Sequence, residues 1–489
     1  MRIRNAAPFT ALMMVIALAG PVLAQAPNID YLGDTSRTRS GRLKIFGSGF
    51  GASAAGSAVH IAGISAWTAT WTDGKIVAYV PEGALLGTVE VQVSTASGQS
   101  NSVNLDVTPR QPLGRVRWRF EADSLDLWWR PALGPDGTIF VHGSQGYVYA
   151  LTPDGGLKWL AKLDWYPYTP PAAGPDGASY YASIQTVFAL NPDGTERWRH
   201  TDTGAQGVTV GPEIGPGGDV FVANDFGLGA FALSPSGTPR WNNPGNPVMW
   251  QYGGTGAEMV FGGTQPGGSI DSFYVAMDRQ LEGRLYGFSL SGQQRFAVPV
   301  GSQDSPFRQQ QIQPAVGPDG TVYVTHMKDF GGGWSLEAFR PQDGQSLWYH
   351  TVGTDLSPPE VGPDGIVYLA THSKVSAFDP ATQQVLWNHS DGTIADQPTV
   401  SPLNDMLVMS GVQTFGMPGY VKAIDHAGQL LWKVRLPGRP YPLPRLVGVH
   451  RPRFTPDGSV AYLSTTFLAP PPGDPHSFLY AFATGELQE

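Results

Sequence analysis

Short runs of β-branched and aromatic residues recur along most of the chain, and turns separate them. In one unit, the run 138–141 follows a Gly-Pro-Asp-Gly turn and precedes a second run, 148–151. A further Pro-Asp-Gly turn then leads to a segment that carries a tryptophan, Trp159. Pro-Asp-Gly is a typical tight turn between two strands. The unit therefore predicts a small antiparallel sheet whose last strand contains the tryptophan.

The opening phrase of this unit, a proline followed by a Gly-Pro-Asp-Gly turn or a close variant, returns along the chain. Its copies begin at Pro131, Pro171, Pro212, Pro314, Pro359, Pro398 and Pro452. We expect a worn copy near residues 253–256. A period of about 40 to 55 residues built from short strands is typical of a β-propeller.

An aromatic residue closes each unit. These residues are Trp118, Trp159, Trp198, Trp241, Phe296, Trp348, Trp387 and Trp432. One closing segment, residues 115–120, precedes the first opening phrase, whereas no such segment follows the last one. We therefore expect the N-terminal strand to complete the C-terminal blade, because this pairing would close the ring and remove an exposed edge. The prediction is an eight-bladed β-propeller closed by an N-terminal strand.

The pattern Leu-Tyr-Ala-Leu, a short glycine turn and then tryptophan resembles the quinoprotein-type (PQQ-like) propeller repeat, over residues 114–489. The resemblance implies the fold of quinoprotein dehydrogenases, whose sites use a vicinal disulfide and calcium-binding Glu, Asn and Asp residues. This chain has no cysteine, and none of the calcium ligands can be matched to a position. We therefore expect no cofactor, no metal site and no catalytic residue of that type. Fold alone does not carry function.

A separate unit, residues 27–108, precedes the propeller repeats. In the segment 89–93, valines alternate with Glu90 and Gln92, which is the pattern of a half-buried strand. The glycine-rich segment 41–51, the segment 59–63 and the segment 98–101 follow in the order of an IPT/TIG domain, which this unit resembles. That resemblance implies an immunoglobulin-like sandwich, so the predicted fold class is all-β. Residues 109–113 form a short linker.

The first residues predict export. Arg2 and Arg4 precede the apolar run 11–19, and small residues end at Ala24, so residues 1–24 are expected to be a signal peptide. We expect no membrane span after it. The formal net charge of −9 disfavours a nucleic-acid partner. The predicted location is the periplasm, the cell surface or the extracellular space.

Residues just before the opening phrases should rim the funnel on the face opposite to the Pro-Asp-Gly turns. Unlike the turns, they differ from blade to blade, and departure from a repeat often marks function. The predicted ligand-binding residues are Trp129, Arg130, Tyr252, Gln313, Asp396, Gln397, His450 and Arg451. Ring closure would make Arg130 and Arg451 neighbours, which favours an acidic ligand. The structural alternative is that each arginine pairs with an acid such as Asp126 or Asp396.

Two functions remain open at this point. The first is an exported binding or scaffold protein that captures a protein or glycan ligand. The second is an enzyme at the funnel, either a cofactor-dependent oxidoreductase or a carbohydrate-active hydrolase or lyase, because a carboxylate pair can be hidden among scattered acids. The histidines His142, His326 and His372 are interpreted as loop residues at the ends of second strands. We favour the binding protein because no catalytic constellation is visible.

Overall fold

The computed structural model describes residues 26–110, 112, 114–124, 127, 129–183, 185–201, 210–223, 230–243, 258–265, 267–279, 282–301, 313–327, 333–353, 356–371, 374–392, 394–395, 397–412, 419–436, 445–449, 451–468 and 477–485. Every regular element in this part of the chain is a β-strand. No helix long and apolar enough to cross a membrane is found there. The predicted signal peptide lies outside the described residues.

The N-terminal unit consists of two sheets that enclose one core. The first sheet has the order β1 (Asn28–Leu32), β3 (Arg42–Ser48), β7 (Lys75–Tyr79) and β6 (Thr68–Trp71). The second contains β2 (Ser36–Thr38), β10 (Val103–Thr108), β8 (Gly87–Thr95), β4 (Ala58–Ile61) and β5 (Ile64–Ser65), with β9 (Gly98–Gln99) paired to β8. Val89, Val91 and Val93 of β8 are buried in the core. The alternation predicted for this strand is confirmed.

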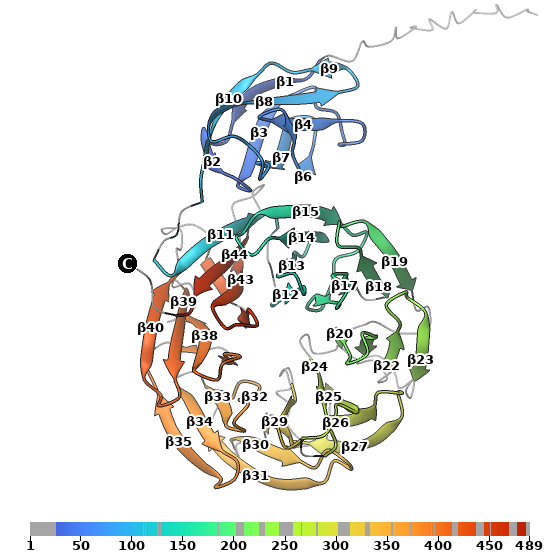
Figure 1. The fold of residues 1–489 in the computed structure, drawn as a ribbon, viewed down its shortest axis with the longest axis vertical. Helices are drawn as coiled ribbons and strands as arrows, with labels where there is room; N and C mark the ends of the chain where they lie inside the picture. Colours follow the sequence, from blue (N-terminus) through green and yellow to red (C-terminus); the bar gives the residue numbers. More distant parts are fainter. Residues whose placement is uncertain are drawn as a thin grey trace, which may run out of the picture.

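The remaining described strands form eight sheets, which Figure 1 shows one after another around a ring. Sheet 1 is β12 (Ala132–Leu133), β13 (Ile139–His142), β14 (Tyr147–Leu151) and β15 (Leu157–Lys162); sheet 2 is β16 (Ala172–Ala173), β17 (Ser179–Ala182), β18 (Thr186–Leu190) and β19 (Glu196–Thr201); sheet 3 is β20 (Val210–Ile214), β21 (Val220–Ala223), β22 (Ala230–Leu233) and β23 (Pro239–Asn243); sheet 4 is β24 (Met259–Gly262), β25 (Ser272–Arg279), β26 (Glu282–Ser289) and β27 (Gln294–Val300).

The second half of the ring repeats this arrangement. Sheet 5 is β28 (Ala315–Val316), β29 (Val322–Met327), β30 (Trp334–Phe339) and β31 (Ser346–Gly353); sheet 6 is β32 (Glu360–Val361), β33 (Val367–Ala370), β34 (Val375–Asp379) and β35 (Gln384–His389); sheet 7 is β36 (Ile394–Ala395), β37 (Thr399–Val400), β38 (Met406–Val412), β39 (Gly419–Asp425) and β40 (Leu430–Arg435); sheet 8 is β41 (Arg445–Val449), β42 (Arg453–Phe454), β43 (Val460–Leu468), β44 (Ser477–Ala483) and β11 (Val116–Ala122). The strand pairs within these sheets are antiparallel.

Sheet 8 joins the two ends of the ring sequence. Strand β11 pairs with β44 in the register Arg119 to Tyr480 and Phe120 to Leu479. Trp118, Phe120 and Leu479 share one buried apolar cluster. The strand that precedes the first repeat is therefore the outer strand of the sheet built from the last one.

Each closing tryptophan contacts the sheet that follows it. The Trp118 indole N–H donates to the carbonyl oxygen of Pro153, at 2.9 Å, in the last turn of sheet 1. Gly155 in that turn has a φ of 86°, and a Cβ there would lie 2.5 Å from the Trp118 ring. Glycine is needed for both reasons. Trp159, Trp198, Trp241, Trp387 and Trp432 make the same kind of bond to the next sheet.

Two details of the sequence interpretation were wrong. In sheet 4 the first turn lies between β24 and β25, where Thr264 bonds to Asp271, rather than near residues 253–256, because this copy carries a longer turn without the Pro-Asp-Gly signal. His142 and His326 are strand residues, only 3% and 4% exposed, rather than loop residues. His372 lies outside the described residues.

Candidate functional site

The first strands of the sheets lie nearest the centre of the ring in Figure 1. A cavity of about 660 Å³ lies among them. Its wall includes Gly134 and Pro135 of the first turn of sheet 1, together with the guanidinium-bearing residues Arg130, Arg451 and Arg453. Because β12 is only two residues long, one cavity reaches from the repeated turns to the residues that precede the opening phrase. We call this space the central channel.

Arg130 and Arg451 share a carboxylate in the central channel. A terminal nitrogen of Arg130 lies 3.4 Å from the Glu258 carboxylate, and a terminal nitrogen of Arg451 lies 3.2 Å from the same oxygen. Arg130 also donates to Glu213, at 3.1 Å, and Arg451 is paired with Glu360. The two arginines are therefore neighbours, as the sequence predicts, and glutamates from three other repeats neutralise them.

The electrostatics of these pairs follow from burial and proximity. Burial alone would lower the pKa of Arg130, but Glu258, Glu213 and Glu360 outweigh it and raise the pKa overall. Burial raises the pKa of Glu213, and the neighbouring Glu258 adds to the effect, although Arg130 opposes it. The cluster is a compact structural ion network rather than an open pair of cations.

A third arginine, Arg453, faces the same space from β42. Its side chain is exposed on the wall of the central channel. Within the described part of the chain, no ion pair or hydrogen bond joins its guanidinium to a carboxylate. The guanidinium is lined by protein on the channel wall, and this desolvation lowers the pKa of Arg453, as do Arg130 and Arg451, while Glu213 and Glu258 act in the opposite direction. Arg453 is thus the arginine of the cluster that, among the described residues, has no carboxylate bonded to it.

The other predicted site residues are dispersed. The Trp129 carbonyl oxygen accepts a hydrogen bond from Ser464, at 2.7 Å. Gln313 and Gln397 are buried, each 7% exposed. Tyr252, Asp396 and His450 lie outside the described residues, and so does Asp126. Among the described residues, the pairing of each arginine with an acid that the structural alternative proposed is made by Glu213, Glu258 and Glu360.

Sequence reasoning missed Arg453 and the three glutamates, although a signal for some of them exists. The residue after the opening proline is alanine in sheets 1, 2 and 5, but it is Glu213 in sheet 3, Glu360 in sheet 6 and Arg453 in sheet 8. Comparing the repeats two positions further on, at the residue after the opening proline, would have found these three residues. Glu258 precedes β24 in the sheet whose opening phrase is worn, so no alignment of phrases indicates it.

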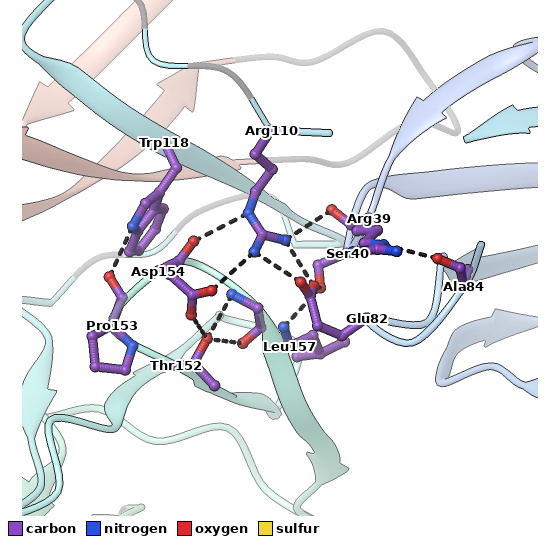
Figure 2. A network of polar contacts seen from close by, with 11 residues as sticks. Arg39, Ser40, Glu82, Ala84, Arg110, Trp118, Thr152, Pro153, Asp154 and Leu157 are labelled. Atoms are coloured by element: carbon purple, nitrogen blue, oxygen red, sulfur yellow. Dashed lines mark hydrogen bonds and ion pairs between the residues drawn. The ribbon is translucent and has the colours of Figure 1, made fainter. Parts of the chain in front are cut away.

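A second polar cluster joins the N-terminal unit to the ring (Figure 2). Arg110 donates to both carboxylate oxygens of Glu82, at 2.7 and 2.9 Å, and to the carbonyl oxygen of Asp154, at 3.1 Å. Ser40 donates to Glu82 and accepts from the backbone N–H of Leu157, each at 2.8 Å. Burial would raise the pKa of Glu82, but the bonds from Arg110 and Ser40 lower it overall. The linker residue Arg110 therefore fastens both units.

A buried ion pair lies beside this cluster. The guanidinium of Arg42, on β3, donates to Asp123, immediately after β11, at 2.9 and 2.5 Å. The two side chains are 2% and 1% exposed. Thr70 donates to the second Asp123 oxygen, at 2.6 Å. The Asp123 backbone N–H is directed at the hydroxyl oxygens of Tyr79 and Tyr149. We call the contacts of these residues, together with those of Arg110, the domain junction.

No group of three or more His, Asp or Glu side chains in the described ranges is arranged to hold a metal ion. The fold and the tryptophan contacts define a β-propeller of short four-stranded repeats. A family model described as outer membrane protein assembly factor BamB matches residues 99–247 and 282–447, and the chain belongs to this family. An IPT/TIG domain model matches residues 35–108. Both resemblances inferred from the sequence are confirmed.

Solved structures support the same fold. BamB from Moraxella catarrhalis is 15% identical, with a TM-score of 0.50 over 74% of this chain and 98% of that one. The Dos1 propeller is 13% identical, with a TM-score of 0.51 over 77% and 95%. Sqt1 from Saccharomyces cerevisiae is 11% identical, with a TM-score of 0.54 over 76% and 100%. At these identities the likeness concerns the fold alone. No curated protein matches the chain.

Proposed function

We propose that the chain is an exported, non-enzymatic binding protein whose central channel captures an acidic segment of a partner protein. The observation that carries this proposal is Arg453, a channel arginine without an acidic partner in the described residues, beside two arginines that glutamates neutralise. Membership of the family described as an outer membrane protein assembly factor supports a protein partner in the cell envelope. The proposed location is therefore the periplasm or the envelope surface.

The proposal includes a scaffold. The eight described sheets are taken as the blades of one closed propeller, with β11 as the strand that closes it. Residues 1–24 are taken as a signal peptide, residues 27–108 as the IPT/TIG domain, residues 109–113 as the linker and residues 114–489 as the propeller. A closed ring holds the first strands rigidly, which keeps the channel side chains in place before a ligand binds.

An acidic ligand is favoured by the charge arrangement around Arg453. Desolvation by the surrounding protein is the largest cause that lowers the pKa of Arg453, and the positive charges of Arg130 and Arg451 add to it. A ligand carboxylate beside Arg453 would relieve this repulsion, and guanidinium binds a carboxylate through two parallel hydrogen bonds. The carboxylates of Glu213 and Glu258 repel an anion, so the ligand should enter from the end of the channel that is lined by the first turns of the sheets.

The test is a binding titration with a fluorescein-labelled peptide of alternating Glu and Ser, read by fluorescence anisotropy. The wild-type protein should bind the peptide. Arg453→Gln should weaken binding at least about tenfold without lowering the melting temperature. The matched control is Arg240→Gln, which removes the same charge from an outer-strand arginine paired with Asp219.

Equal binding by the wild-type protein and the Arg453→Gln variant would contradict the proposal. Oligogalacturonate, which presents the same carboxylate on a sugar, serves as the second ligand. If the protein binds oligogalacturonate but not the peptide, the ligand is an acidic glycan, and the proposal that it is a segment of a partner protein is contradicted.

A further inference from the structure

One position of the outer strand is occupied by a cationic residue in some sheets and by an apolar residue in others. The residue before the closing aromatic residue is a cation in five sheets and leucine in the three sheets that follow one another as sheets 5, 6 and 7. The cations are Arg117, Lys158, Arg197, Arg240 and Arg295, and the leucines are Leu347, Leu386 and Leu431. The position is the same in every repeat, so the change is a local departure from an otherwise repeated pattern.

In the first sheets this cation neutralises the aspartate of the first turn. Lys158 lies 3.0 Å from Asp136 in sheet 1, and Arg197 pairs with Asp176 in sheet 2, at 2.5 Å. In sheet 3, Arg240 pairs at 3.0 Å with Asp219, which stands two positions later in the turn, where sheet 1 has Thr138. Asp136 also accepts hydrogen bonds from the backbone N–H and the hydroxyl of Thr138. The Asp136 pKa is lowered to about 2, because the bonds from Thr138 and Lys158 outweigh burial.

Sheet 5 keeps the turn and loses the cation. Asp319 accepts from the backbone N–H and the hydroxyl of Thr321 at 3.0 and 2.8 Å, the same distances as in sheet 1. In place of the lysine stands Leu347, which is 48% exposed. Among the described residues no cation pairs with Asp319. In sheet 1, Lys158 stands at the position of Leu347 and reaches Asp136, which stands at the position of Asp319, so we infer that Leu347 lies near Asp319.

Sheets 6 and 7 extend this surface along the rim. Leu386 and Leu431 are 53% and 47% exposed. The flanking residues Tyr349, Val385 and Leu430 are also exposed. In sheet 6, a ring nitrogen of His426 lies 3.9 Å from the Asp364 carboxylate. Figure 1 shows the three outer strands β31, β35 and β40 following one another around the outside of the ring. We call the six apolar residues and the two aspartates the rim surface.

An exposed leucine in place of a paired cation makes a protein without a bound partner more prone to unwanted association. Each strand β31, β35 and β40 is the outermost strand of its sheet, and lysine or arginine on such strands opposes unwanted association. Apolar groups that gather on a surface mark an interaction site more often than scattered ones do. The loss of the cation also leaves turn carboxylates that a partner's cation can pair with.

We propose that the rim surface binds a segment of a partner protein in which apolar and cationic side chains alternate. The apolar side chains contact Leu347, Leu386 and Leu431, and the cations take the place that Lys158 occupies in sheet 1, beside Asp319 and Asp364. Charge complementarity thus selects a basic segment, whereas the central channel selects an acidic one. This surface lies on the outside of the ring, so the proposal does not depend on the channel.

The test restores the cations of the other repeats in the triple variant Leu347→Lys, Leu386→Lys, Leu431→Lys. The probe is a fluorescein-labelled peptide of alternating Lys and Val, with a Glu and Val peptide as the control ligand. The triple variant should bind the Lys and Val peptide at least about tenfold more weakly than the wild-type protein. Its melting temperature should be unchanged or higher, because the lysine introduced in place of Leu347 can reach Asp319.

A charge-matched control separates this effect from general repulsion. It places lysines at exposed positions of sheets 3 and 4, as Ser236→Lys, Gln293→Lys and Gln294→Lys, and should bind nearly as well as the wild-type protein. Equal losses in the two triple variants would overturn the proposal. The proposal would also be overturned if the wild-type protein sediments as a dimer and only the rim variant is a monomer, because the occupant would then be a second copy of the chain. It would likewise be overturned if the wild-type protein, but not the rim variant, floats with anionic vesicles, because the occupant would then be a lipid surface.

Discussion

The domain junction and the central channel are both built from arginines and carboxylates, but they differ in what they leave open. At the junction, Arg42 and Asp123 are almost completely buried, and Arg110 makes bonds to both units. In the channel, Arg130 and Arg451 are paired with glutamates, whereas in the described residues no carboxylate forms an ion pair or a hydrogen bond with Arg453, although Glu213 and Glu258 lie near enough to act on its charge. We propose that the paired charges hold the structure together and that the unpaired Arg453 binds the ligand.

This difference predicts opposite results for mutations in the two regions. Junction variants should lose stability and keep ligand binding in the fraction that stays folded. A variant of Arg453 should keep stability and lose binding. Variants of Arg130 and Arg451 should behave like the junction variants and lose stability, because the loss of either arginine would leave a glutamate without its cation.

The largest effect is expected for deletion of residues 115–120, which removes most of β11. The deletion exposes the edge of β44 and removes the strand that leads into Asp123, so sheet 8 and the domain junction should fail together. We expect aggregation or loss of cooperative thermal unfolding, measured by circular dichroism and light scattering. A melting curve like that of the intact protein would contradict the closed ring.

The next largest effect is expected for Arg42→Met. Removing one partner of a buried pair leaves the Asp123 carboxylate buried without a cation, which typically costs about 3 to 5 kcal/mol. Urea unfolding should show this loss in the free energy of unfolding. Arg37→Met is the matched control, since Arg37 pairs with Asp34 at the surface and should cost about 1 kcal/mol or less. Similar losses in the free energy of unfolding for the two variants would contradict the claim that Arg42 and Asp123 form a buried, mutually neutralised pair.

A smaller effect is expected when pH changes, because the contributions of Glu82 and Glu213 to the free energy of unfolding should depend on pH in opposite directions. The pKa of Glu82 is lowered in the folded protein, so its contribution to stability is present above the unfolded pKa and is lost as pH falls through the folded value. The pKa of Glu213 is raised, so its protonated form favours folding, and that contribution is lost as pH rises through the folded value.

The pH prediction is measured by urea unfolding of Glu82→Gln and Glu213→Gln across the acidic range. Relative to the wild-type protein, Glu82→Gln should be least destabilising at the lowest pH. Glu213→Gln should be least destabilising, or stabilising, at the highest pH of that range. The same pH trend in both variants would remove this distinction between the junction and the channel.

The sequence predicted the regular parts of the structure because each repeat carries its own local signals. A Pro-Asp-Gly turn and a tryptophan that needs a glycine partner, such as Trp118 with Gly155, are visible within a few residues. Where the turn signal is missing, as at Thr264 to Asp271, the sequence placed the opening turn too early. The register of the repeats also predicted that Arg130 and Arg451 are neighbours.

The remaining parts of the two sites depend on contacts that no local pattern records. Glu258 reaches Arg130 and Arg451 from a sheet whose opening phrase is worn. Arg42 meets Asp123 across the two units of the chain, at a distance of 81 positions in sequence. Such pairs are set by how whole sheets pack, so a single sequence without its fold gives no reason to choose Glu258 over the acids nearer in sequence.

The most direct test of the central claim is the charge reversal Arg453→Glu, measured against the Glu and Ser peptide and a Lys and Ser peptide of equal length. We predict that the variant loses the acidic peptide, binds the basic one more tightly than the wild-type protein does, and melts at nearly the same temperature. A variant that binds the acidic peptide as the wild-type protein does would contradict the claim that Arg453 holds the ligand.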